Sequence, residues 1–251
     1  MRILGILLAS STLVFAANGF AQESTKVAAN IDVKALVEVV KTSPVSPEGR
    51  AALQQLEQAA DAGDVSALTA LGYAYSAGKG VAQDPAKAAE FFQKAADAGD
   101  KSALTALGYA YSAGKGVAQD PKKAVKLFLE GLNAGDKSAL VALGYAYSGG
   151  KGVKKDRRKA VQYFEEAANN QMVDGYVALR YMDQNRLVKL IQTSLSDSKI
   201  YHGPINGLLT KNTIQALNSF CKNNSILAAC TAGPLSETAI RKYSALLPLR
   251  S

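Results

Sequence analysis

The chain has 251 residues and a formal net charge of +8, with 29 Lys and Arg against 21 Asp and Glu. Its single histidine, His202, has no cysteine pair or carboxylate cluster around it, so we expect no metal site. Without a second histidine or a recognisable nucleophile motif, we also expect no catalytic residues and no cofactor.

Residues 1–21 have the pattern of a signal peptide. Arg2 precedes a short apolar run, and the small residues Gly19 and Ala21 favour cleavage before Gln22. The run is too short, and too often interrupted by Ser, Thr and Asn, to span a membrane. We therefore expect a secreted, periplasmic protein with no stable membrane insertion. For an exported chain, nucleic acid is not an expected partner, despite the basic charge.

Residues 22–50 form an N-terminal segment in which we expect one short helix, over residues 32–41. The apolar residues of that helix share one face: Val33, Leu36, Val37 and Val40. Ser46 and Pro47 then cap and begin the next helix. Leu56 and Gly63 have the phase of a second repeat helix, because Gly63 lies 36 residues before Gly99. We therefore expect a half-repeat that caps the repeats described next.

A long motif recurs along the middle of the chain. The letters SALTALGYAYSAGKGVAQDP occupy residues 66–85 and recur unchanged at 102–121, and an edited copy follows at 138–157. The period is 36 residues, which indicates a stack of supersecondary units. We expect full repeats at 66–101, 102–137 and 138–173, within a stack over residues 51–182.

One period contains two predicted helices. Leu71, Ala74 and Tyr75 have helical spacing, and Gly78 favours the end of that first helix. Asp84 is a cap for the second helix, and Pro85 stands at its first position. The repeat region should therefore be all-α.

The motif is similar to the Sel1-like repeat. The matching residues in the first copy are Ala67, Leu71, Gly72, Tyr75, Gly78, Gly80, Val81, Asp84, Lys87, Ala88, Phe91, Phe92, Lys94, Ala95, Ala96 and Gly99. The resemblance implies an α/α superhelix of helix pairs that binds protein partners on its concave side and is not an enzyme.

A row of tyrosines occurs once per repeat, at Tyr73, Tyr109, Tyr145 and Tyr181. The resemblance places this position on the concave side, and it assigns Tyr75, Tyr111 and Tyr147 to the core. Exposed tyrosines supply contact area and hydroxyl groups at low entropic cost, which suits a partner-binding site. We expect Thr69, Thr105 and the serines at 76, 112 and 148 to add polar groups to the same groove. Packing inherited by duplication is the alternative interpretation.

A basic cluster begins the second helix of the third repeat. Its members are Lys151, Lys154, Lys155, Arg157, Arg158 and Lys159. The other repeats have AQDPAK and AQDPKK in the same place. Cations at a helix N-terminus oppose the helix dipole. Keeping them there indicates an anion-binding site for a wall carboxylate, a lipid head group or an acidic protein, and a solvated loop is the alternative.

Residues 186–251 form a second module, joined to the stack by a junction over residues 183–185 that is short enough for a docked pair. We expect three helices, over residues 187–195, 213–220 and 236–247. The segment resembles the peptidoglycan-binding-like domain through Ile191, Gln192, Leu195, Tyr201, Gly203, Pro204, Ile205, Gly207, Thr213, Ala216, Leu217 and Phe220. It departs from that pattern at Asn206, Thr210 and Cys221.

The second resemblance implies peptidoglycan as a further partner. The residues of the wall-binding loop would then be Tyr201, Gly203, Asn206, Gly207 and Thr213. Residues 180–251 are also the basic part of the chain, with nine Lys and Arg against three Asp and Glu. Cys221 and Cys230 are the only cysteines, and in an oxidising compartment they favour a disulfide.

These observations leave three functional hypotheses. In the first, an exported non-catalytic adaptor binds a protein through the repeats and docks to peptidoglycan or the envelope through its C-terminal module. In the second, a periplasmic regulator or inhibitor binds one protein, and the module is only a cap. The third, a cell-wall hydrolase, is disfavoured because the sequence shows no activated serine or metal site.

Overall fold

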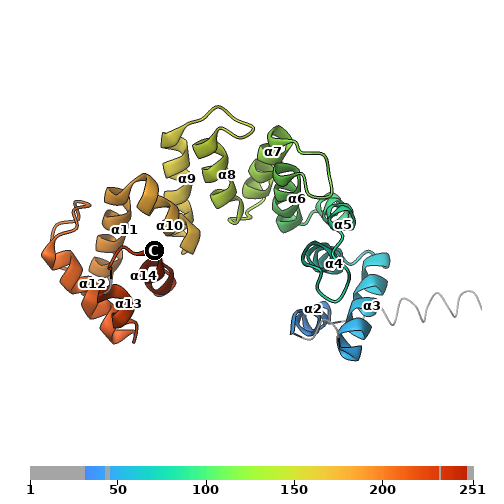
Figure 1. Cartoon of the computed structure of the whole chain (residues 1–251), viewed down its shortest axis with the longest axis horizontal. Helices are drawn as coiled ribbons and strands as arrows, with labels where there is room; N and C mark the ends of the chain where they lie inside the picture. Colours follow the sequence, from blue (N-terminus) through green and yellow to red (C-terminus); the bar gives the residue numbers. More distant parts are fainter. Residues whose placement is uncertain (1–31, 43–45, 232, 248–251) are drawn as a thin grey trace, which may run out of the picture. The chain divides into compact units, whose positions relative to one another are not determined.

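The computed structural model of the chain describes residues 32–42, 46–231 and 233–247 (Figure 1). The signal peptide expected at 1–21 lies outside these residues. Within them every regular element is a helix, so the all-α prediction is confirmed. The chain divides into two compact units, Met1–Ala103 and Leu104–Ser251.

The first unit contains α2 (Val33–Thr42), α3 (Pro47–Asp61), α4 (Val65–Ala77) and α5 (Pro85–Asp97). The short N-terminal helix is confirmed as α2, and it packs against both α3 and α4. Val37 of α2 and Leu56 of α3 lie 36 residues before Tyr73 and Phe92. The half-repeat expected before the first full repeat is therefore a whole helix pair.

Each repeat forms two helices, as its local signals predict. In the first repeat, α4 ends at Gly78, which has a φ of +67° and donates its backbone N–H to the carbonyl of Ala74. The carboxylate of Asp84 accepts hydrogen bonds from the backbone N–H groups of Ala86 and Lys87, and Pro85 begins α5. Asp120 and Asp156 cap the corresponding helices of the next two repeats.

The helices of a repeat approach closely through glycine. A Cβ atom on Gly72 would lie 2.5 Å from the ring of Phe92. The same closeness recurs between Gly108 and Phe128, at 2.6 Å, and between Gly144 and Phe164, at 2.5 Å. The repeated glycine therefore leaves room for a buried phenylalanine against the backbone of the first helix.

The second unit contains the remaining helices. The boundary between the units falls within α6 (Lys101–Ala113). The others are α7 (Pro121–Asn133), α8 (Ala139–Gly149), α9 (Arg157–Asn169), α10 (Val173–Met182), α11 (Gln184–Asp197), α12 (Lys211–Asn223), α13 (Leu227–Thr231) and α14 (Glu237–Tyr243). One buried cluster joins α8, α9 and α10 to the C-terminal helices and includes Phe164, Leu179, Ile191, Leu217 and Tyr243.

The C-terminal module differs from the prediction at three points, the first being its last helix, which ends at Tyr243 and not at residue 247. The junction is a single residue, because Asp183 both ends α10 and caps α11, and residues 184 and 185 are helical. The module also has a fourth helix, α13, which was not predicted. Helix α13 has only five residues, and a disulfide joins its Cys230 to Cys221 of α12. The predicted disulfide is therefore present.

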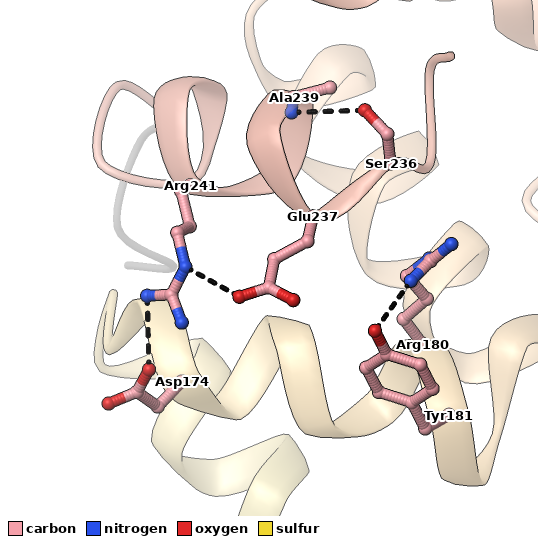
Figure 2. A network of polar contacts seen from close by, with 7 residues as sticks. All are labelled: Asp174, Arg180, Tyr181, Ser236, Glu237, Ala239 and Arg241. Carbon is pink, nitrogen blue, oxygen red and sulfur yellow. Dashed lines mark hydrogen bonds and ion pairs between the residues drawn. The ribbon is translucent and has the colours of Figure 1, made fainter.

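Helix α14 packs against α10 at the end of the stack. Tyr243 is fully buried there, and burial raises the pKa of its phenol. Arg241 donates hydrogen bonds to Asp174 of α10, at 3.3 Å, and to Glu237, at 2.9 Å (Figure 2). The amide of Gln171 donates to the carbonyl of Leu247. The module is thus docked against the third repeat and α10, as the short junction predicts.

Candidate protein-binding surface

One tyrosine of each repeat is exposed and held in place from one side. The exposed fractions of Tyr73, Tyr109 and Tyr145 are 52%, 48% and 55%. Their rings meet the phenylalanine of the next helix edge-on, with centroid separations of 5.0 Å, 5.1 Å and 5.0 Å. Such edge-to-face pairs are favourable and restrict the ring. Each repeat therefore presents a fixed aromatic surface to solvent.

The fourth member of the row, Tyr181, lies at the end of α10 and is 67% exposed. Its hydroxyl accepts a hydrogen bond from Arg180, at 2.8 Å, and the guanidinium lies 4.9 Å from the ring centroid (Figure 2). An arginine therefore restrains this ring, where the earlier members are restrained by phenylalanine.

The second tyrosine of each repeat is half-buried and covered by a lysine. The Nζ atoms of Lys87, Lys123 and Lys159 lie 5.2 Å, 4.0 Å and 5.1 Å from the ring centroids of the tyrosines that they cover, which are Tyr75, Tyr111 and Tyr147. This cation–π contact recurs in all three repeats. Lys159 therefore has a structural role that the anion-binding prediction did not foresee.

A pocket of about 360 Å³ lies between the second and third repeats, and we call it the Tyr109–Tyr145 pocket. Helix α7 supplies an apolar wall that includes Ala124, Val125 and Phe128. The volume of the pocket is near the lower end of the range for small-molecule sites, about 300–1,000 Å³.

A corresponding pocket of about 370 Å³ lies in the first unit, beside Tyr73. The residues that line it from α4 and the following loop are Ala70, Tyr73, Ala74, Ser76, Ala77 and Lys79. Each lies 72 residues before a residue of the Tyr109–Tyr145 pocket, and those are Ala142, Tyr145, Ala146, Ser148, Gly149 and Lys151. The same repeat surface therefore lines a pocket in both units. The predicted serines do line these pockets.

The two threonines predicted in the groove are buried instead. Thr69 is 9% exposed, and its hydroxyl donates to the carboxylate of Asp100. Thr105 is 2% exposed, and its hydroxyl has no hydrogen-bond partner among the described residues. Both lie four residues before the exposed tyrosine, on the side of the helix that faces the interior. The prediction that these two threonines belong to the groove is therefore wrong.

Asp100 has a perturbed carboxyl group. Burial by itself would raise its pKa, but hydrogen bonds from the side chains of Thr69 and Ser102 and from backbone N–H groups outweigh burial and lower the pKa. The hydroxyl of Thr69 thus stabilises the charged form of an aspartate at the end of the same repeat, directly before α6.

The electrostatic surroundings of Tyr145 include helix α14. Burial raises the pKa of its phenol, and the negative charge of Asp174 adds to that effect. Arg241 of α14 acts in the opposite direction, and Glu237 again raises the pKa. The C-terminal module therefore places charges near the tyrosine row of the third repeat.

Two of the six residues in the basic cluster have partners within the chain. Arg157 donates to the carbonyl of Met182, the last residue of α10, and Lys159 covers Tyr147. The other four are exposed and form no ion pair within the described residues, and these are Lys151, Lys154, Lys155 and Arg158.

The predicted wall-binding loop is held by a buried glutamine. The side chain of Gln192 accepts hydrogen bonds from the backbone N–H groups of Asn206, at 3.1 Å, and Gly207, at 2.9 Å, and it donates to the carbonyl of Leu208, at 3.0 Å. It also donates to the hydroxyl of Thr213, at 3.1 Å. The motif residues around Gln192 therefore fix the shape of the loop.

Most residues named for wall binding are turned inward. Tyr201 is 3% exposed, Thr213 is fully buried, and Gly207 is buried. A Cβ atom on Gly203 would lie 2.5 Å from the hydroxyl oxygen of Tyr201. Of the five, only Asn206 is exposed.

The loop presents apolar side chains to solvent. Ile205 is 41% exposed and Leu208 is 55% exposed. The exposure of Leu208 could not be predicted, because an apolar residue in a short loop gives no sign of whether it is buried. His202 is also exposed.

Two further properties concern the described residues as a whole. None of their helices is long and apolar enough to cross a membrane. Nor do these residues bring together three or more His, Cys, Asp or Glu side chains that could hold a metal ion.

Comparison with known proteins identifies the repeats. The family model of the Sel1 repeat matches residues 65–100, 101–136 and 137–172, one residue earlier than the register expected from the sequence. No curated protein matches the chain.

Two solved structures have a similar fold. A Sel1 repeat protein from Oxalobacter formigenes is 22% identical, with a TM-score of 0.55 over 81% of this chain and 78% of that one. A protective antigen of uropathogenic Escherichia coli strains, described as displaying an SLR fold, is 24% identical, with a TM-score of 0.59 over 90% of this chain and 56% of that one. Proteins with Sel1 repeats typically mediate protein–protein interactions and are generally not catalytic. Residues 65–172 of this chain are three consecutive Sel1 repeats.

Proposed function

We propose that this protein is an exported, non-catalytic adaptor that binds a protein partner through the tyrosine row of its repeats. The observation that carries the proposal is the recurrence of one exposed tyrosine per repeat with a pocket beside it in each unit. Protein interfaces are enriched in tyrosine, and their strongest contacts are aromatic side chains next to pockets.

The pairing of each tyrosine with a buried phenylalanine supports this interpretation. The ring is restrained before any partner arrives, so little side-chain entropy is lost on binding. About half of each ring is open to solvent, which leaves contact area for the partner.

The test is capture of partners from an envelope extract. We compare the wild type with a variant in which Tyr73, Tyr109 and Tyr145 are all changed to Ala. A control variant replaces two exposed apolar residues outside the row, Ile205 and Leu208, with Ser. The proposal requires that a protein captured by the wild type and the control is lost from the tyrosine variant, and equal capture by all three would refute it.

Export is supported by the disulfide between Cys221 and Cys230, because disulfides persist in oxidising compartments. Alkylation of whole cells before lysis would test it. The proposal expects both thiols to be blocked by the bridge and the protein to fractionate with the periplasm. A reduced protein in the cytosolic fraction would contradict it.

Docking of the C-terminal module to peptidoglycan is a second candidate function. It is supported by the loop that Gln192 holds in place, with Ile205 and Leu208 exposed, and by the basic charge of residues 180–251. Sedimentation of the full-length protein with purified sacculi at low salt tests it. We expect the wild type and the tyrosine variant to sediment, and the variant with Ser at positions 205 and 208 to sediment less.

The alternative is a periplasmic regulator or inhibitor of one partner, without wall binding. Its support is the core that α10 shares with α11 and α14, since a module packed in this way also acts as a cap on the stack. Full-length protein that stays in the supernatant with sacculi, while still capturing its protein partner, would favour this alternative.

A further inference from the structure

Positive charge increases along the three repeats at one position, the loop that leads into the second helix. Residues 79–87 contain two lysines and one aspartate, and residues 115–123 contain three lysines and one aspartate. Residues 151–159 contain six cations and one aspartate. The third repeat thus differs from the other two by additional positive charge, in a stretch whose sequence is otherwise similar.

This difference removes an interaction that holds the loop in the other repeats. The side-chain amide of Gln83 donates to the carbonyl of Ser76, at 2.8 Å, and that of Gln119 donates to the carbonyl of Ser112, at 2.9 Å. The equivalent residue in the third repeat is Lys155, which forms no such bond within the described residues. The third loop therefore has a cation in place of a structural hydrogen bond.

One cation of the cluster belongs to the Tyr109–Tyr145 pocket. Lys151 lines that pocket together with Tyr109, Tyr145, Ser112 and Ser148. The next residue, Gly152, packs directly on the start of α7, since a Cβ atom there would lie 2.0 Å from the carbonyl oxygen of Pro121. The loop is therefore held at the edge of the pocket. Three exposed cations follow Gly152 in the sequence, and these are Lys154, Lys155 and Arg158.

We propose that the Tyr109–Tyr145 pocket receives an apolar side chain from an acidic peptide segment of the protein partner. The carboxylates that flank this side chain face Lys151, Lys154, Lys155 and Arg158. This inference rests on the proposed function and specifies the chemistry of the partner. Apolar walls bind the anchor side chain, and the charges at the edge attract the acidic chain and select it over others.

A peptide is favoured over a lipid surface by the arrangement of the site. A membrane surface is bound by clusters of cations that face a plane of head groups. Here Lys151 is the one cation that lines the pocket, and the pocket has an apolar wall of Ala124, Val125 and Phe128. An apolar recess with cations on one edge complements a single side chain between acidic residues.

The experiment selects peptides from a random library displayed on phage, using the full-length protein as target. The selected peptides are then synthesised and titrated against three variants. The first variant carries Lys154→Ala, Lys155→Gln and Arg158→Ala, which gives the loop the residues of the first repeat at these positions and allows the glutamine bond to form. The second carries Tyr145→Ala. The control carries Lys189→Ala, Lys211→Ala and Lys222→Ala, which removes the same charge from exposed positions in the C-terminal module.

We expect selected peptides that contain an aromatic or aliphatic residue flanked by Asp or Glu. Their affinity should fall about tenfold or more in the loop variant at low salt, and also in the tyrosine variant, and should change little in the control. Peptides without acidic residues that depend on Tyr145 but not on the loop would overturn the acidic partner while keeping the protein-binding function.

Anionic vesicles of phosphatidylglycerol provide the other arm of the test. Binding to vesicles that the loop variant loses, in a protein that selects no acidic peptide, would assign the cations to a lipid surface and overturn the proposal. Equal effects of the loop variant and the charge-matched control would likewise overturn it.

Discussion

At the scale of single residues, equivalent positions of the three repeats have different surroundings, although the amino-acid sequences of the repeats are nearly identical. Thr69, Thr105 and Val141 occupy one repeat position, and all three are buried. The hydroxyl of Thr69 has the carboxylate of Asp100 as a partner, whereas that of Thr105 has none among the described residues. A buried hydroxyl without a partner costs stability, so one residue type has opposite effects at two copies of one site.

The same substitution should therefore change stability in opposite directions at these two positions. We expect Thr105→Val to raise the free energy of unfolding by about 1 kcal/mol, because it removes a buried hydroxyl without a partner and reproduces the third repeat. Thr69→Val should lower it by about 1 kcal/mol, because it removes a hydrogen bond to a carboxylate. Chemical denaturation of both variants measures the difference, and an equal loss at both positions would contradict the assignment.

The pKa of Asp100 leads to a prediction about acid. Its pKa is lowered in the folded state, so its carboxylate contributes stability above its ordinary pKa, and this contribution is lost as the pH falls through the folded value. Thr69→Val should raise the pKa of Asp100 toward the ordinary range, which NMR titration of the carboxyl group would measure. The stability difference between the wild type and the variant should shrink in acid. A difference that is constant from neutral to acid pH would rule out the bond to Asp100 as its source.

At the scale of helices, the contact between the glycine and the phenylalanine of each repeat fixes how closely the pair packs. The ring of Phe164 fills the space that a side chain at Gly144 would need. The N-terminal pair has Leu36 and Leu56 at the two equivalent positions, so its helices meet with different side chains. The exposed tyrosine follows the glycine directly, and its edge contact with the same phenylalanine depends on this packing.

Gly144→Ala should therefore lower the free energy of unfolding by about 1–3 kcal/mol, because the added methyl group overpacks the helix pair. Gly149→Ala is the matched control in the same helix. A Cβ atom there meets its nearest neighbour at 3.6 Å, and the other two repeats already have Ala77 and Ala113 at that position. Thermal melts of the two variants should separate clearly, and a Gly144→Ala melt no lower than that of the control would show that the glycine is not required.

Local signals explain which helices could be predicted from the sequence. Gly78 ends α4, and Asp84 and Pro85 begin α5. Each of these residues acts within its own turn, and the structure confirms the predicted boundaries. Helix α13 has no such signal, since it is short and is held by a disulfide to α12.

The candidate site was less predictable, because it depends on tertiary contacts. The exposed tyrosines follow from the repeat pattern, but the pockets beside them need a second wall from the preceding helix pair, which no local spacing reveals. Tertiary contacts also explain why the sequence did not show that Thr69 and Thr105 are buried. The same holds for Arg157 and Lys159, whose partners lie within the chain.

At the scale of the whole molecule, the C-terminal module and the end of the stack share one buried core within the second unit. Tyr243 of α14 and Leu179 of α10 belong to the same cluster, and Asp174 and Arg241 connect the two helices at the surface (Figure 2). That exposed ion pair contributes little, and the buried area dominates the contact. The module and the third repeat should therefore unfold together.

The disulfide should stabilise the second unit, in which the C-terminal module and the end of the stack share one buried core. Closing the short loop between Cys221 and Cys230 contributes roughly 2.5–3 kcal/mol on the loop-entropy model. Reduction should lower the melting temperature of the second unit, and a variant with both cysteines changed to Ala should show no further effect of reductant. An unchanged melt, with both thiols titrating free in the native protein, would contradict the bridge.

Site-specific photo-crosslinking can establish whether the tyrosine side of the repeats contacts a protein partner. A benzophenone amino acid is placed singly at Tyr73, Tyr109 or Tyr145, and for comparison at Lys126. Lys126 is an exposed residue of α7, with a side chain 77% accessible, that does not line the pocket. We expect a common crosslinked product from the three tyrosine positions and none from Lys126. Crosslinking from Lys126 alone, or equally from all four positions, would contradict it.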